Sequence, residues 1–294
     1  MHQNILQYRG RRYLWVVLAL LILSLIIYLS QPSDLPPNGG SWQGYTLGGI
    51  AAALIVWLAL LGYRKRSFRS RLGTLQGWTS AHVYLGSGLL IIASLHCAFQ
   101  FGFNIHTLLY VLMTAVILSG FLGLFFYLSY PRRLARVRSG RRRTDWLTEL
   151  NEIDDRIHKL AQRCNARTRK IVESALDRTH LGGGAIAQLR GVDRSLVLRP
   201  DRETSESKLI GNPEQETVIE HLASAVPKAT KSDEAQVLQE LLNVFGRRRT
   251  VLSRLRQDIR LQAWMKAWLY AHVPLTVAML SALVVHVISV FLYW

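Results

Sequence analysis

Four of the nine histidines lie within long apolar stretches of the chain, where an ionisable side chain is costly. His82 and His96 share one stretch, and His272 and His286 share another, with a spacing of 14 residues in each pair. In a helix, 14 residues come within about 40° of four full turns and advance roughly 21 Å, so both histidines of a pair face one direction at different depths. Because neutral imidazole is a common metal ligand, the pattern predicts ligands at two levels.

These histidines predict two stacked haem groups with two axial ligands each. If the two stretches cross the membrane in the same direction, His82 lies level with His272, and His96 lies level with His286. For a single intramembrane histidine, an interhelical hydrogen bond or a proton path would be the better explanation. Two pairs with the same spacing favour haem, and we expect acceptors on the second ring nitrogen to fix each tautomer.

Other metal centres are disfavoured by the residue types and their spacing. Copper or zinc needs several ligands around one ion, whereas roughly 21 Å separates the two histidines of each helix and no cysteine or carboxylate supplements them. The two cysteines, Cys97 and Cys164, exclude a disulfide scaffold, a multi-cysteine metal site and the CxxCH attachment of c-type haem. We interpret both as packing residues.

Five apolar segments must position the histidines. The chain is 50% hydrophobic yet has a formal net charge of +17, and its charges avoid four long stretches, one of which is long enough for two crossings. About 20 apolar residues cross a bilayer core as a helix. The sequence therefore predicts an all-α membrane protein, a bundle of five transmembrane helices at about 13–30, 46–63, 79–99, 107–129 and 268–292. A signal peptide is the alternative for the first segment, although no small-residue cleavage site stands out.

The distribution of Lys and Arg predicts the orientation. Basic residues precede the first span, follow the second at 64–71 and follow the fourth at 132–143, whereas the loops at 31–45 and 100–106 contain none. Since cytoplasmic loops are enriched in Lys and Arg, we expect a multi-pass protein of the bacterial inner membrane with a cytoplasmic N-terminus and a periplasmic C-terminus. The basic runs are juxtamembrane, where anionic lipid explains them better than nucleic acid, so we expect no nucleic-acid partner.

A polar segment between the fourth and fifth spans divides the chain into 1–130, 131–265 and 266–294. The two ends of this segment carry apolar residues at alternating steps of three and four, a heptad pattern in which Arg248 takes one seam position. The middle contains loop signals and a short helix at about 214–225. We therefore predict a cytoplasmic helical hairpin, a coiled-coil-like stalk, which is either a structural spacer or a docking surface.

Further residues are predicted to contact the haem groups. Gly86, one turn from His82, would let a porphyrin approach the helix backbone. At the inner level, propionates could be neutralised by Arg71, Arg260 and Lys266, whereas no Lys or Arg lies near the outer level. We interpret His106, at the outer end of the fourth span, as an interfacial residue, with contact to a haem propionate or a partner as the alternative.

The segments that carry the histidines resemble those of di-haem membrane cytochromes b. The resemblance rests on the stretches AHVYLGSGLLIIASLHCAF, SGFLGLFFYLSYPRRL and AHVPLTVAMLSALVVHVISVFLYW. The paired-histidine pattern is similar to that of the transmembrane domain of ferric reductases and NADPH oxidases, and it implies that His82, His96, His272 and His286 are axial ligands of two b haems. Those families generally continue into flavin- and nicotinamide-binding domains, whereas this chain stops at Trp294. We therefore expect no direct NADPH oxidation by this chain.

The expected function is electron transfer across the membrane by a non-catalytic subunit of an oxidoreductase complex. Haem iron with two histidine ligands has no open coordination position, which favours electron transfer over oxygen binding. The expected partners in a hetero-oligomeric complex are membrane lipid, quinol, a periplasmic c-type cytochrome and a cytoplasmic flavoprotein or iron–sulfur protein. A membrane anchor or assembly scaffold with structural haem is the alternative from another class, and a quinol-oxidising subunit is a third hypothesis.

Overall fold

The computed structural model describes residues 5–32, 36–67, 73–138, 140–200, 207–229 and 231–292. The chain divides into two compact units. The transmembrane unit comprises Met1–Phe126 and Trp268–Trp294, and the polar unit comprises Tyr127–Ala267. Two long helices, α4 (Ile105–Arg138) and α9 (Ser232–Leu292), contribute residues to both units.

Five helices are long and apolar enough to cross a membrane, which confirms the five predicted spans and the multi-pass membrane class. Their apolar parts lie in α1 (Arg12–Leu29), α2 (Trp42–Arg66), α3 (Leu75–His96), Ile105–Tyr130 of α4 and the C-terminal part of α9. A short 3-10 helix, η1 (Ile5–Gln7), precedes α1. Many large apolar side chains on these helices are exposed, as lipid-facing residues must be.

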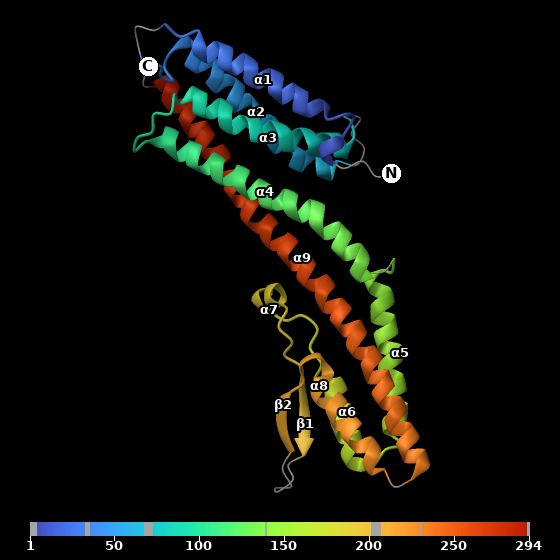
Figure 1. Cartoon of the computed structure of the whole chain (residues 1–294). Coiled ribbons are helices and arrows are strands. Elements are labelled where there is room, and N and C mark those ends of the chain that lie inside the picture. The colour runs from blue at the N-terminus through green and yellow to red at the C-terminus, as the bar shows by residue number, and fades with distance from the viewer. Residues whose placement is uncertain are drawn as a thin grey trace. The chain divides into compact units, whose positions relative to one another are not determined.

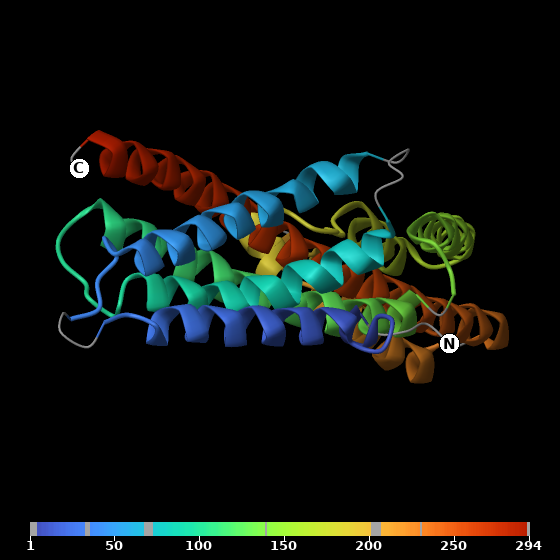
Figure 2. The same cartoon turned by 90° about the horizontal axis from the view of Figure 1, so that it is seen from above.

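Close helix packing in the transmembrane unit centres on α3. Figures 1 and 2 show α1, α2 and α3 side by side, and α3 contacts both of the other two. A side chain added at Gly88 of α3 would overlap the Val17 side chain of α1, so the glycine allows these helices to approach closely. The buried core also takes in residues of α4 and α9, including Met113, Met279 and Leu283. The helices that carry the four histidines thus belong to one packed core.

The polar unit has a separate hydrophobic core of its own. It contains α5 (Arg143–Ala161), α6 (Ala166–Asp177), α7 (Ala185–Arg190), α8 (Glu216–Ala225) and the N-terminal part of α9, with the 3-10 helices η2 (Pro213–Gln215) and η3 (Val226–Lys228). The predicted heptad residues are buried there, among them Trp146, Leu150, Ile153, Ile157 and Leu160 of α5. Apolar residues of α6, α8 and α9 complete the same core.

Antiparallel ion pairs join α5 to α9 within the polar unit. The start of α5 pairs with the later part of this region of α9 and the end of α5 with the earlier part: Arg143 with Asp258, Glu149 with Arg247, Asp154 with Arg248, and Arg156 with Glu240. Arg248, the charged residue at the heptad seam, is only 1% exposed. Its guanidinium donates hydrogen bonds to Asp154, Thr179 and Gln215, which explains how a cation is tolerated in the core.

A two-stranded antiparallel hairpin occupies the middle of the polar unit, where the sequence signals indicated loops. Strands β1 (Leu196–Pro200) and β2 (Ser207–Gly211) pair so that Val197 lies opposite Ile210. Val197 is almost fully buried in the core, which anchors the hairpin against the helices. The short helix expected at about 214–225 is present as α8. The polar unit is therefore more elaborate than two long helices alone.

Candidate cofactor site within the membrane helices

The two histidines of α3 are both held by backbone carbonyls of α2. His82 Nδ1 lies 3.1 Å from the carbonyl oxygen of Leu58, and His96 Nδ1 lies 2.8 Å from the carbonyl oxygen of Gly44. Leu58 and Gly44 are themselves 14 residues apart, the same spacing as the histidines they hold. One antiparallel neighbour therefore supports both histidines in the same way at two depths.

The two histidines of α9 are both held by side chains of α4. His272 Nδ1 lies 2.7 Å from Ser119 Oγ, and His286 Nδ1 lies 2.6 Å from His106 Nδ1. Ser119 and His106 are 13 residues apart on α4. The arrangement repeats on this side of the bundle, except that side chains take the place of carbonyls.

These hydrogen bonds determine which ring nitrogen carries the proton. A carbonyl oxygen only accepts, so His82 and His96 must each donate from Nδ1. The Ser119 hydroxyl is also within hydrogen-bond distance of the Val116 carbonyl, and when it donates its proton there it accepts from His272. In each of these neutral rings, Nε2 then keeps a lone pair. Within the part of the chain that the structure describes, no Nε2 of the four histidines has a hydrogen-bond partner.

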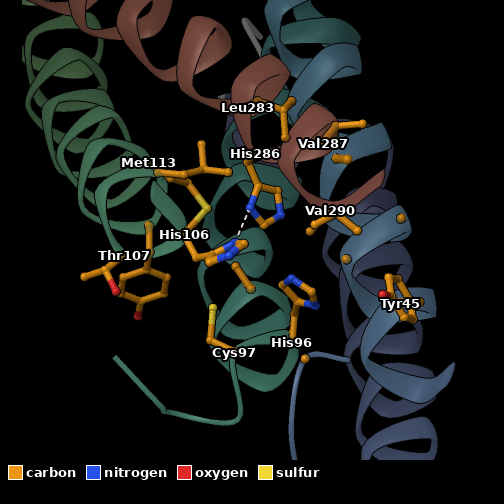
Figure 3. Close-up of a pocket in the computed structure, with 18 of the residues that line it drawn as sticks. Tyr45, His96, Cys97, His106, Thr107, Met113, Leu283, His286, Val287 and Val290 are labelled. Carbon is orange, nitrogen blue, oxygen red and sulfur yellow. Dashed lines mark hydrogen bonds between the residues drawn. The ribbon is translucent and has the colours of Figure 1, made fainter. Parts of the chain in front are cut away.

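A cavity of about 580 Å³ opens at the outer histidines, within the size range of cofactor pockets. Figure 3 shows His96, His106 and His286 turned toward one space, from α3, α4 and α9 respectively. The ring centres of His96 and His286 lie 6.2 Å apart, with the ring planes at 88°. Two imidazoles that bind one metal ion from opposite sides, each at about 2 Å, have ring centres roughly 6 Å apart. The donor set at this level fits a pair of axial haem ligands.

At the inner level, His82 of α3 contacts the Leu58 carbonyl and His272 of α9 contacts Ser119. The Trp268 indole stacks on the His272 ring, with centres 5.3 Å apart, and its Nε1 donates to the carbonyl of Ser119. A methyl group at Gly123 of α4 would overlap this indole, so the glycine makes room for Trp268 against α4. Trp268 and Ser119 together restrain the orientation of His272.

Three residues around the histidines go beyond what the sequence patterns indicated. His106 contacts His286 directly instead of only marking the interface. Ser119 carried no recognisable signal. Gly48 was not singled out, yet a Cβ there would lie 2.7 Å from His96 Cε1. The glycines between 39 and 49 are the one sequence feature that could have indicated this close approach to α2.

The remaining predicted contact residues are less closely tied to the histidines. Gly86 is half-buried, and a Cβ there would make only an ordinary contact with Leu58. Arg71 lies outside the described residues. Lys266 is exposed, and both it and Arg260 belong to the polar unit, so their contact with propionates stays a prediction. Among the described residues, no three His, Cys, Asp or Glu side chains gather in a cluster able to hold a metal ion.

The chain was compared with protein-family models, curated proteins and solved structures, and none matched. The class that the fold defines is a multi-pass helical membrane protein. Within that class, the particular feature of this chain is two levels of paired intramembrane histidines, each fixed through Nδ1.

Proposed function

We propose that this protein is a di-haem membrane cytochrome b subunit that carries electrons across the membrane between separate redox partners. One observation carries the proposal: four half-buried histidines on two membrane helices each have Nδ1 held by a neighbouring helix, while Nε2 has no partner among the described residues. Metal-ligating histidines almost always show this pattern, because the bond from the second nitrogen fixes the tautomer and the ring orientation.

In this proposal His96 and His286 hold the outer haem, and His82 and His272 hold the inner one. When bound, a haem with two histidine ligands supplies one-electron transfer. The chain orients the ligands through α2 and α4. Roughly 21 Å of helix separates the two levels.

The proposed setting is the bacterial inner membrane, with the N-terminus and the polar unit cytoplasmic and the C-terminus periplasmic. The concentration of Lys and Arg in alternate connections supports this orientation. The proposed partners are membrane quinol or a cytoplasmic flavoprotein or iron–sulfur protein on one side, and a c-type cytochrome on the other. No direct NADPH oxidation is proposed for this chain.

The test is to purify the full chain from cells supplied with haem and to record its reduced-minus-oxidised spectrum and haem content. We expect a b-type spectrum with two haems per chain. His96→Ala and His82→Ala should each remove one haem, whereas His158→Ala, at an exposed position of α5, should remove none. A wild-type chain that binds no haem under these conditions would refute the proposal.

A membrane anchor or assembly scaffold is the second candidate, and the folded core of the polar unit favours it, because a spacer needs no such core. The two candidates differ in whether electron flux through the complex depends on the histidine ligands. If His96→Ala leaves electron flux through the assembled complex intact, the scaffold explains the protein better. If both haems titrate and a quinol analogue or a partner protein reduces them, electron transfer explains the protein better.

A further inference from the structure

We infer that His106 is a positioning residue for the outer haem, and that it accepts the Nδ1 proton of His286 so that His286 Nε2 can bind iron. The inference rests on the proposed function and extends it to a residue that does not itself bind the metal. It starts from the shortest contact at the site, 2.6 Å between His106 Nδ1 and His286 Nδ1.

Two neutral imidazoles that meet through their Nδ1 atoms share one hydrogen, so the pair has two arrangements. In the first, His286 donates and His106 accepts, which leaves a lone pair on His286 Nε2. In the second, His106 donates, and His286 then carries its proton on Nε2, where it cannot bind a metal. Ligation by His286 therefore requires His106 to be the acceptor.

The inner level shows the same role filled by a different residue. On α4, Ser119 contacts His272 Nδ1 at the inner level. His106 contacts His286 Nδ1 in the same way at the outer level. The rings of His106 and His286 lie nearly perpendicular, with centres 4.6 Å apart, so the contact is edge-on and leaves the far edge of His286 free. Figure 3 shows His106 on the α4 side of His286, separate from His96.

The acceptor has a consequence for the electronic character of the site. A hydrogen bond from the second ring nitrogen raises the basicity of a ligating imidazole. A more basic ligand stabilises the oxidised iron and lowers its reduction potential. Removal of the acceptor at His106 should therefore raise the midpoint potential of the outer haem alone.

Redox titration of the full chain tests this with four variants. His106→Ala should raise one of the two midpoint potentials, and His106→Asn, which keeps an acceptor oxygen near the Nδ1 position, should restore it toward the wild-type value. Ser119→Ala, the matched variant at the other level, should raise the other potential. His286→Ala identifies the outer haem, because that haem should be lost.

Loss of one haem in His106→Ala together with its retention in His106→Asn would also support the inference. Unchanged potentials in His106→Ala, or equal shifts of both haems, would overturn it while leaving the proposed function intact. Loss of the outer haem in both His106 variants would indicate that His106 is itself a ligand, which also overturns the inference. A wild-type chain without haem refutes the proposed function and the inference together.

Discussion

The His96 ring packs against α2 at Gly48, where the absence of a side chain leaves room for the ring. A Cβ at Gly48 would lie 2.7 Å from His96 Cε1 and 3.0 Å from Nδ1, whereas a Cβ at the adjacent Gly49 would meet nothing within 4 Å. We predict that Gly48→Ala displaces the ring from the Gly44 carbonyl and lowers the amount of bound outer haem. Gly49→Ala should bind as much as the wild type.

The measurement is haem per chain, followed by thermal unfolding in detergent. Overpacking typically costs about 1–3 kcal/mol, so Gly48→Ala should also unfold at a lower temperature. Alanine is a better helix former than glycine by up to about 1 kcal/mol, which predicts a slight gain for Gly49→Ala. Equal haem content and equal unfolding temperature in the two variants would show that haem binding does not depend on the position of His96 against α2.

A half-buried histidine makes the polar unit sensitive to acid. Burial lowers the pKa of His221, and the nearby cations Arg167, Arg199 and Lys228 lower it further. The unfolded chain therefore binds a proton more readily than the folded chain, so the contribution of this residue to stability is full above its ordinary pKa of 6.5 and is lost as the pH falls below it.

We predict that His221→Leu loses less stability than the wild type as the pH falls below about 6.5. Hydrogen exchange of peptides from α8, measured in the full chain as a function of pH, checks the prediction. His158→Leu, at an exposed position of α5, is the control and should exchange like the wild type. Acid sensitivity that persists unchanged in His221→Leu would assign it to other groups.

At the residue scale, the sequence predicts the proposed ligands but not the groups that hold them. His82 and His96 are recognisable because an ionisable side chain in an apolar segment is costly. Such residues at a regular spacing therefore indicate a functional role. Their partners are carbonyls of Leu58 and Gly44, and every residue has a carbonyl. Only the packing of α2 against α3 determines which carbonyl lies opposite which ring.

At the scale of elements, one buried cation connects four segments of the polar unit. Arg248 of α9 bonds to Asp154 of α5, to Thr179 after α6 and to Gln215 before α8. Arg248→Met removes the donor and leaves the buried Gln215 and the part-exposed Asp154 carboxylate without it, at a cost of about 2 kcal/mol, because buried acceptors lose a charged hydrogen-bond donor.

The adjacent Arg249 provides the matched control, because its ion pair with Glu214 is exposed on both sides. Arg249→Met should cost at most about 0.5 kcal/mol. Hydrogen exchange of α5 peptides in the full chain reports on both variants. Protection should fall in Arg248→Met and recover in part when Asp154→Leu is added, since an apolar pair can replace a buried ion pair. Equal protection in all variants would mean that the network does not hold these elements together.

The elements themselves are predictable to different degrees. The spans follow from hydropathy, because a helix in lipid must satisfy its own backbone hydrogen bonds. The hairpin β1–β2 was missed because each strand has only five residues and β1 ends in Pro200, which signals a turn. Arg248 looked like a break in the heptad pattern, and only its partners from distant segments explain it.

At the scale of the whole molecule, we expect the five candidate spans to place the two ends of the transmembrane unit on opposite sides of the membrane, because their number is odd. The start of α1 and the end of α9 lie at opposite ends of this unit (Figure 1). The connection between α1 and α2 and the one between α3 and α4 contain no Lys or Arg, whereas basic residues follow α2 and α4. By the positive-inside rule, we expect the connection between α3 and α4 to lie outside and the polar unit to lie in the cytoplasm.

This orientation can be measured with single cysteines in a chain that carries Cys97→Ala and Cys164→Ala. We predict that a membrane-impermeant maleimide added to intact cells labels Phe103→Cys, at an exposed position between α3 and α4. It should label Arg163→Cys, exposed in the polar unit, only after the cells are permeabilised. The reverse pattern would put the basic connections outside, against the positive-inside rule, and would exchange the sides on which the proposed electron donor and acceptor meet the two histidine levels. In the proposed function, the orientation therefore decides which partner reaches His96 and His286 first, and this labelling measures the orientation independently of haem binding.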